Sequence, residues 1–162
     1  SRKPRLGETS DLRFMEEALK EAGKAFKKGE VPVGAVIAHG GVIIGRGHNS
    51  REKGHDPSAH AEMSAIRSAA KKLKGWRLSH STLYVTLEPC LMCMGALIQA
   101  RIPRLVFAAF DPKAGACGSL YDVSNDKRLN HRLDVTSGVC EEEARALLKG
   151  FFKALRDKLK RT

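Results

Sequence analysis

Residues 82–93 read TLYVTLEPCLMC and join a predicted β-strand directly to a predicted helix. The apolar run 82–87 predicts a buried strand, which ends at Glu88-Pro89. Residues 90–100 are then predicted to be helical, and Pro103 closes that helix because proline cannot continue it. A strand that passes straight into a helix is the repeating unit of an α/β sheet.

The same alternation extends on both sides of this segment. Residues 105–110 predict the next strand, and upstream a helix at 60–73 follows two short strands at 33–37 and 42–44. Strand, helix, strand, helix and strand in succession indicate parallel crossovers, with helices packed on the faces of the sheet.

Cap and turn residues set the remaining boundaries. Ser10-Asp11 is predicted to cap a helix that ends before Gly29, and residues 39–41 are predicted to connect the two short strands as a tight hairpin. Residues 45–58 form a predicted loop that ends in Asp56-Pro57, a cap with proline in the first helical turn. We also expect a strand at 134–139 and a helix at 141–159.

The chain has 162 residues, a length typical of one domain, which we assign to 11–162, with an N-terminal extension at 1–10. It carries 29 Lys or Arg against 18 Asp or Glu, a formal charge of +11. Such a balance suggests an anionic partner, most often nucleic acid, and a merely solubilising surface is the alternative. No apolar run approaches the ~18 residues of a membrane span, and residues 1–4 lack a signal peptide's apolar core, so we expect a cytoplasmic protein.

Two short motifs at predicted helix starts carry the chemistry, His-x-Glu at 60–62 and Cys-x-x-Cys at 90–93. Functional groups of α/β sheets gather beyond the carboxyl ends of the strands, so these two helix starts are predicted to meet. Cys90 and Cys93 lie three positions apart, on one face of a helical turn. Together with the His60 imidazole, the two thiolates form a donor set suited to tetrahedral Zn²⁺.

Three protein ligands leave one position for a water, whose pKa zinc lowers to about 7. Glu62 is two residues from His60, close enough to hydrogen-bond that water as a general base. The combination of His-x-Glu with Pro-Cys-x-x-Cys is the signature of zinc deaminases. A closed structural site that recruits Cys117 is the alternative, but it would leave Glu62 without a task. Cys117 and Cys140 are otherwise expected in the core.

From about residue 11 to 155, the chain resembles the bacterial tRNA-specific adenosine deaminases, a branch of the cytidine deaminase superfamily. The matching segments are EVPVGAV (30–36), GHN (47–49), AHAEM (59–63), LYVTLEPC (83–90) and NHR (130–132). The resemblance implies a three-layer α/β/α domain with a five-stranded mixed sheet, a homodimer, and one Zn²⁺ per subunit. It also implies conversion of adenosine to inosine at the wobble position of a tRNA anticodon, typically that of an arginine tRNA.

Carried over to this sequence, the resemblance implies that His60, Cys90 and Cys93 bind zinc. Glu62 would take a proton from the water, pass it to N1 of adenine, and help to protonate the departing ammonia. Asn49 would hold the flipped adenosine, although an asparagine that only supports a turn is the alternative.

Three further residues are expected to contact RNA. Asp111 would bind a ribose hydroxyl of the anticodon loop, because a carboxylate cannot attract phosphate. Asn130 belongs to another RNA-contacting segment of the family. Phe152 would pack against a splayed base, since Phe151 fits the core stripe of its helix. Further basic residues are candidates for phosphate contacts: Lys71, Lys72, Lys74, Arg77, Arg101, Arg104, Lys153, Arg156, Lys158, Lys160 and Arg161.

Two other functions compete with this interpretation. A deaminase of free cytosine, guanine or nucleotides would share the zinc chemistry, but the basic charge and Asn130 argue against it. A non-catalytic RNA-binding subunit with a structural zinc would be free to lose Glu62, which is present.

Overall fold

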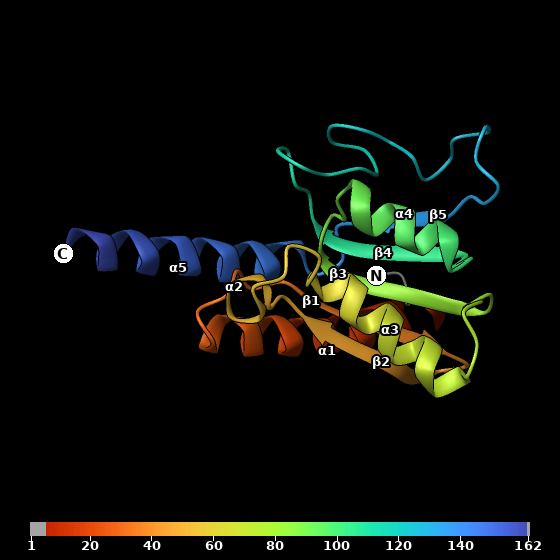
Figure 1. The fold of residues 1–162 in the computed structure, drawn as a ribbon, viewed down its shortest axis with the longest axis horizontal. Helices are drawn as coiled ribbons and strands as arrows, with labels where there is room; N and C mark the ends of the chain where they lie inside the picture. Colours follow the sequence, from red (N-terminus) through yellow and green to blue (C-terminus); the bar gives the residue numbers. More distant parts are fainter. Residues whose placement is uncertain (1–5, 162) are drawn as a thin grey trace, which may run out of the picture.

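A five-stranded mixed sheet with the strand order β2-β1-β3-β4-β5 forms the centre of the protein (Figure 1). The structure is a computed structural model that describes residues 6–161, with side chains from Ser10 onward. The strands are β1 Gly34–His39, β2 Val42–His48, β3 Ser81–Leu87, β4 Arg104–Ala109 and β5 Asp134–Ser137. β3, β4 and β5 run parallel, while β1 pairs antiparallel with both of its neighbours. The predicted crossovers are therefore present, with β1 lying between β2 and β3.

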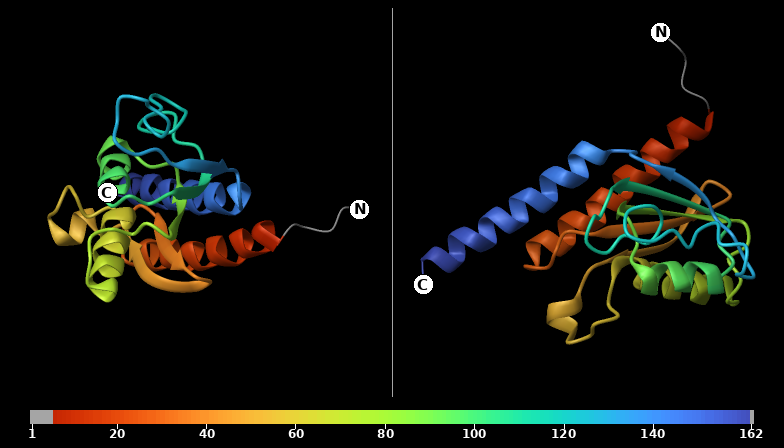
Figure 2. Two further views of the ribbon diagram at one scale, coloured as in Figure 1. Left: turned by 90° about the vertical axis from the view of Figure 1, so that its right-hand side faces the viewer. Right: turned by 90° about the horizontal axis from the view of Figure 1, so that it is seen from above.

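Helices cover both faces of the sheet and complete the predicted three-layer α/β/α fold (Figure 2). They are α1 Leu6–Lys27, α2 Arg51–Gly54, α3 Ala61–Leu73, α4 Leu91–Gln99 and α5 Glu141–Lys160. α3 and α4 lie on one face, and α1 and α5 lie on the other. Within residues 6–161, no helix is long and apolar enough to cross a membrane.

The strands bury alternate side chains in two separate apolar cores. Leu83 and Val85 of β3 belong to the core beneath α3 and α4, whereas Tyr84 between them belongs to the core beneath α1 and α5. This is the period-2 alternation of a sheet that is covered on both faces. Ala65 and Ala69 are fully buried on the inner face of α3, and their small size lets the helix lie close to the sheet.

β2 is longer than the sequence predicted, because it continues through residues 45–48. We predicted a loop there on account of Gly45 and Gly47. In the structure, a Cβ added to Gly47 would lie 2.7 Å from Ser64 Cβ and 2.8 Å from the Ala65 nitrogen. The glycines therefore serve the close approach of α3 to the strand, a use that glycine also has within strands.

α1 begins at Leu6, so the prediction that Ser10-Asp11 caps this helix is wrong. Asp11 instead accepts two hydrogen bonds of 2.7 Å from Arg104 and one of 2.9 Å from the Tyr84 hydroxyl. Its carboxylate thus joins α1 to β3 and β4. Of the predicted extension, residues 1–5 lie outside the described part of the chain, and 6–10 belong to α1.

Asp56-Pro57 also does not cap a helix. Asp56 Oδ1 accepts hydrogen bonds from the Ser58 nitrogen and hydroxyl, which closes a local turn, and α3 starts only at Ala61. An aspartate can favour either motif, because the same side-chain oxygen caps turns as well as helices. The predicted hairpin connection is confirmed, since Gly40 and Gly41 both have positive φ, 56° and 79°.

Candidate active site

α3 and α4 begin at the same edge of the sheet, and the residue that precedes each helix is a predicted metal ligand. His60 is the N-cap of α3 and Cys90 is the N-cap of α4, both with extended backbone and ψ values of 155° and 177°. Neither side chain makes a capping hydrogen bond to its helix. The two side chains turn toward each other, and Cys93 joins them from the first turn of α4.

The distances within this group fit a tetrahedral metal ion. His60 Nδ1 lies 3.6 Å from Cys90 Sγ and 3.5 Å from Cys93 Sγ, and all three ligand atoms lie within 4.8 Å of one another. In a tetrahedral zinc site, with bonds of about 2.05 Å to nitrogen and 2.3 Å to sulfur, these atoms stand about 3.6 Å apart. The residues present therefore match the size of the group that they were predicted to hold.

The charges of the group also favour a cation. A hydrogen bond from the Cys93 thiol lowers the pKa of Cys90 to about 3, helped by the His60 ring, although burial opposes the shift. The same bond, together with burial, raises the pKa of Cys93. Only one of the two thiols is thus readily ionised while the group holds no positive ion, whereas a divalent cation stabilises both thiolates.

Glu62 lies in the first turn of α3 with only 4% of its surface exposed. Burial raises the pKa of its carboxyl group to about 6, because a charge is poorly solvated there. A carboxyl group with a pKa close to neutral can both accept and return a proton, as a general base and acid must.

A cavity of about 530 Å³ opens beside His60, Glu62 and Cys90. Its volume is within the range of roughly 300–1,000 Å³ that small-molecule sites occupy. Its remaining lining comes from loops, the ends of α2, α3 and β3, and α5: Val31, Val33, Asn49, Arg51, Ala61, Leu87, Glu88, Phe110, Asp111, Pro112, Lys113, Ala114, Leu148 and Phe152.

Asn49 lines the cavity and is held by backbone contacts on both sides. Its Nδ2 donates to the Val31 carbonyl at 3.2 Å, and its Oδ1 accepts from the Arg51 nitrogen at 3.4 Å. One amide N–H and one oxygen lone pair remain for a ligand. The two alternatives from the sequence, support of a turn and contact with a base, are therefore compatible.

Asp111 follows β4 and also lines the cavity. Its Oδ1 accepts hydrogen bonds from the backbone nitrogens of Lys113 and Ala114, which holds the loop. Phe152 reaches the cavity from α5 with 42% of its surface exposed, and it stacks edge-on against Phe151 at 5.3 Å between ring centres.

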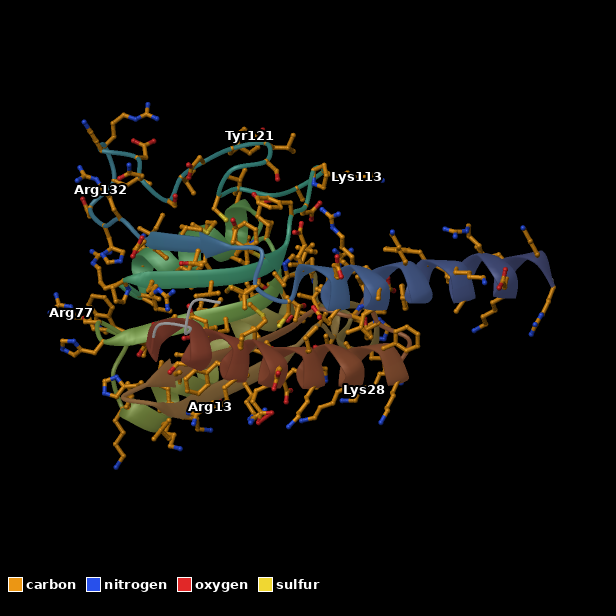
Figure 3. The ribbon with its side chains drawn as sticks, turned by 180° about the vertical axis from the view of Figure 1, so that it is seen from behind. Arg13, Lys28, Arg77, Lys113, Tyr121 and Arg132 are labelled. Atoms are coloured by element: carbon orange, nitrogen blue, oxygen red, sulfur yellow. The ribbon has the colours of Figure 1, made fainter. Side chains whose placement is uncertain are left out.

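Asn130 is not brought to the cavity of its own chain. Next to it, the His131 ring contacts the Ile102 carbonyl at 2.7 Å, just before β4 begins, so this loop lies at the opposite edge of the sheet. Figure 3 shows the same separation between Arg132 and Lys113, which lie at opposite ends of the sheet. RNA contact by Asn130 stays a prediction.

Two buried carboxylates hold the loops that line the cavity, and the sequence had not pointed to either of them. Glu88, 2% exposed, accepts hydrogen bonds from the backbone nitrogens of Asp111, Cys117 and Ser119. Glu30, 1% exposed, accepts from the Glu52 and Lys53 nitrogens beside Asn49. The only signal in the sequence was an acidic residue immediately before an apolar or proline-containing segment.

The metal group includes neither Cys117 nor Cys140 among the described residues, so no fourth cysteine closes it. A three-residue group that could hold a metal ion, a buried carboxylate and a cavity at the carboxyl end of the strands of an α/β/α sheet together match a deaminase of nucleobases. Residues 9–156 match the sequence profile of the MafB19-like deaminases. The chain belongs to this family and, within it, to the tRNA-specific adenosine deaminases, which are hydrolytic enzymes.

Similar sequences of named proteins support the assignment to the tRNA-specific adenosine deaminases. The tRNA-specific adenosine deaminase of Bacillus subtilis is 52% identical over 152 residues, 94% of each chain. That of Haemophilus influenzae is 49% identical over 151 residues, 93% of this chain and 87% of its own.

Solved structures give the same result for the fold. A structure from a study of A-to-I editing by tRNA:A34 deaminases at the wobble position has a TM-score of 0.81 and 44% identity, covering 84% of this chain and 99% of that one. A guanine deaminase from Nitrosomonas europaea has a TM-score of 0.73 at 27% identity, covering 86% and 83%.

Proposed function

We propose that the protein deaminates adenosine to inosine at the wobble position of a tRNA anticodon, in particular that of an arginine tRNA, with one Zn²⁺ per subunit. The observation that carries this proposal is the buried Glu62 beside an open metal group, in a cavity whose rim holds Asn49, Asp111 and Phe152. The resemblance to wobble-position deaminases supports the choice of substrate.

His60, Cys90 and Cys93 are the residues that would hold the zinc ion. When bound, the ion would lower the pKa of a water in the cavity toward neutrality. A purified His60→Ala protein should lose its metal, which elemental analysis measures directly. Retention of one zinc per chain in that variant would contradict the ligand assignment.

Glu62 moves the protons of the reaction. It accepts a proton as water adds to C6 of adenine, delivers a proton to N1, and then helps to protonate the amino group. The C6–N bond breaks, and adenosine and water become inosine and ammonia. The buried position of Glu62 limits its exchange of protons with bulk solvent.

Asn49 and Asp111 both line the cavity and are proposed RNA contacts. The Asn49 amide would hold the flipped adenosine, and the remaining Asp111 oxygen would accept from a ribose hydroxyl, which DNA lacks. Asp111→Ala should therefore lower activity on an RNA stem-loop at low substrate concentration and leave the metal content alone. An unchanged rate would remove this role, and Asn130→Ala tests its own contact in the same assay.

We assign to Phe152 the packing against a neighbouring base. It lines both the catalytic cavity and a second hollow of about 480 Å³ along α5, which is also lined by Lys113, Leu148, Lys149, Leu155, Arg156 and Leu159. An exposed ring beside cationic side chains is a common platform for unpaired bases.

We also propose the homodimer that the family resemblance implies. Leu91 and Met92 at the start of α4 are 50% and 38% exposed, and Leu120 and Tyr121 on the adjoining loop are 54% and 55% exposed. The two segments are joined by the Ala116 nitrogen, which donates to the Pro89 carbonyl. A second copy would bury this apolar surface, and sedimentation equilibrium would measure the association.

A panel of substrates tests the proposed function. The zinc-loaded protein is incubated with an arginine tRNA that bears adenosine at the wobble position, with free adenosine and cytidine, and with guanine. We expect inosine in the tRNA and no turnover of the free compounds. The guanine deaminase neighbour makes a free base the second candidate, and turnover of free bases without inosine in the tRNA would favour it.

A further inference from the structure

A row of positive side chains runs along the outer face of α3 and continues past its end. Arg67, Lys71 and Lys74 are spaced by four and three residues, so they lie on one face of the helix. Trp76 and Arg77 follow directly, and every residue from 71 to 77 is exposed. We call Arg67, Lys71, Lys74, Trp76 and Arg77 the basic stripe.

Trp76 gives the stripe an aromatic end. It is the only tryptophan of the chain and is 57% exposed. The Arg77 guanidinium carbon lies 4.8 Å from its ring centre and that of Arg101 lies 6.0 Å away, on the loop after α4. An exposed ring flanked by guanidinium groups offers a stacking face together with positive charge, the combination that single nucleotides and RNA backbones bind.

Local structure explains only part of this arrangement. The dipole of α3 favours cations in its last turn, which accounts for Lys71. It does not account for Arg67 in the middle of the helix, or for Arg77 and Trp76 beyond its end. Among residues 6–161, none of the four cations of the stripe forms an ion pair.

The acidic groups near the stripe are few. Asp56 is a carboxylate close enough to Arg67 for the two charges to interact. The only acidic residue of α3 is Glu62, which is buried at the cavity. The outer face of the helix is therefore positive from Arg67 to its end.

The helix that carries the stripe begins at the active site, and the stripe itself runs from the middle of this helix to the opposite end of the sheet. α3 begins next to His60, and its 13 residues span about 20 Å. Figure 3 shows Arg77 and the cavity residue Lys113 at opposite ends of the sheet. From Arg67 to Lys74 the stripe spans about 10 Å at 1.5 Å per residue, which corresponds to roughly three phosphates along one strand of a duplex. A stem attached to a loop seated in the cavity presents such a regular row of phosphates, whereas a short flexible single strand does not.

We propose that the basic stripe binds the phosphate backbone of the RNA stem that closes the substrate loop, with Trp76 packing against a sugar or base at its far end. The stripe consists of residues on and just after α3, whereas the apolar surface proposed for the dimer consists of Leu91, Met92, Leu120 and Tyr121, so the two proposed contacts use different residues. This inference rests on the proposed function, since it assumes an RNA substrate.

Trp76 is a built-in probe of this contact, because no other tryptophan contributes to the fluorescence. The zinc-loaded Glu62→Gln protein is titrated with two RNAs, a stem-loop and a short single strand of the same loop sequence, and binding is followed independently by anisotropy of labelled RNA. We expect the Trp76 emission to change in parallel with stem-loop binding and to stay constant with the single strand. Constant emission at saturating stem-loop would overturn the proposal.

A double substitution tests the energetics. Lys71→Glu/Arg77→Glu is compared with Lys20→Glu, which changes an exposed lysine on α1 across the sheet, and circular dichroism verifies that each variant folds. For the stem-loop, the double variant should raise KM by about tenfold, keep kcat, and reduce the slope of log affinity against log salt by about 2. Its kinetics on the short single strand, and those of the control on both RNAs, should match the unsubstituted protein.

The outcomes separate this inference from the proposed function. If the double variant has the same KM for the stem-loop as the unsubstituted protein, the proposed role of the basic stripe is overturned. Inosine formation by the unsubstituted protein would still support the proposed function. Failure of the unsubstituted protein to form inosine in any RNA, with stem-loop binding and the Trp76 signal intact, removes the function and leaves the stripe. Loss of dimer association without loss of RNA affinity in the double variant would reassign the stripe to protein contact and also overturn the proposal.

Discussion

Glu62 combines burial with a position two residues from His60, the proposed metal ligand, and its proposed role depends on both. Replacing it with glutamine keeps the shape and removes the ability to accept a proton. We expect Glu62→Gln to retain its metal and its RNA affinity while kcat falls by roughly 10²–10⁴-fold, the usual contribution of a general acid–base. Inosine formation per metal-loaded chain is the measurement, and near-normal turnover would contradict the mechanism.

Glu88 has no proposed part in the reaction itself. Its carboxylate accepts hydrogen bonds from the backbone of the 111–119 loop, which lines the cavity. In Glu88→Gln, an amide NH₂ would face nitrogens that also donate, so charge-assisted hydrogen bonds worth about 1.5–3 kcal/mol would be lost. We expect a lower free energy of unfolding and a raised KM, because Asp111 and Lys113 form part of the cavity wall.

Urea denaturation and steady-state kinetics measure both effects of the Glu88 substitution. Ser119→Ala is the matched control, since it removes only one donor to the same carboxylate and should have the smaller effect. Equal stability of Glu88→Gln and the unsubstituted protein would show that this network does not hold the loop.

The spacing within each motif, together with the placement of both motifs at helix starts of an α/β sheet, predicted the group of His60, Cys90 and Cys93 with Glu62 beside it. Glu88 and Glu30 could not be found in that way. Their partners are backbone nitrogens 22 to 31 residues away along the chain, and such nitrogens have no signature in the sequence.

At the scale of elements, the seating of α3 against β2 positions Glu62. A methyl group at residue 47 would collide with the first turns of α3, where Ser64 and Ala65 lie. Gly47→Ala should therefore destabilise the protein by about 1–3 kcal/mol and reduce activity along with it.

Gly23→Ala is the control for Gly47→Ala, since nothing lies within 4 Å of the added Cβ and alanine favours a helix by about 1 kcal/mol. In urea denaturation, the free energy of unfolding should be lower than that of the unsubstituted protein for Gly47→Ala and higher for Gly23→Ala. A Gly47→Ala protein as stable as Gly23→Ala would refute the close-packing explanation.

The junction of α1 with the sheet depends on the ionisation of Asp11. Burial alone would raise the pKa of its carboxyl group, but hydrogen bonds from Arg104 and Tyr84 outweigh burial and lower it below the usual 3.8. A carboxylate with a lowered pKa in the folded state contributes stability above its unfolded pKa, and this contribution is lost as the pH falls through the folded value.

Asp11→Asn should accordingly cost about 2 kcal/mol at neutral pH, because it leaves Arg104 without its charged partner. The difference from the unsubstituted protein should stay constant down to about pH 5 and shrink below pH 3.8. Urea denaturation across this range measures it. A difference that does not depend on pH would mean that packing, and not the ion pair, is responsible.

The boundaries of the elements were predictable where one local signal dominated. The Gly40-Gly41 hairpin is such a case. Predictions failed where one residue type serves two purposes: Gly45 and Gly47 indicated a loop but make room for a helix, and Asp11 indicated a cap but forms an ion pair across the core. Only the tertiary structure distinguishes these uses.

At the scale of the whole molecule, the charge of +11 is distributed over more than one region. Arg51 and Lys113 line the catalytic cavity, Lys149 and Arg156 line the hollow along α5, and the basic stripe leads to the far edge of the sheet. The sequence predicted a nucleic-acid partner from the total alone. It could not show which cations surround the cavity and which lie remote from it, because that depends on how α3 and α5 are placed.

Mapping of inosine in a single tRNA tests the central claim most directly. The zinc-loaded protein is incubated with an arginine tRNA that carries adenosine at the wobble position and, as the control, with the same tRNA carrying its adenosine at the neighbouring anticodon position. Sequencing of the products should show inosine at the wobble position of the first tRNA and none in the anticodon of the second. Equal deamination at both positions, or no inosine in either tRNA, would contradict the account.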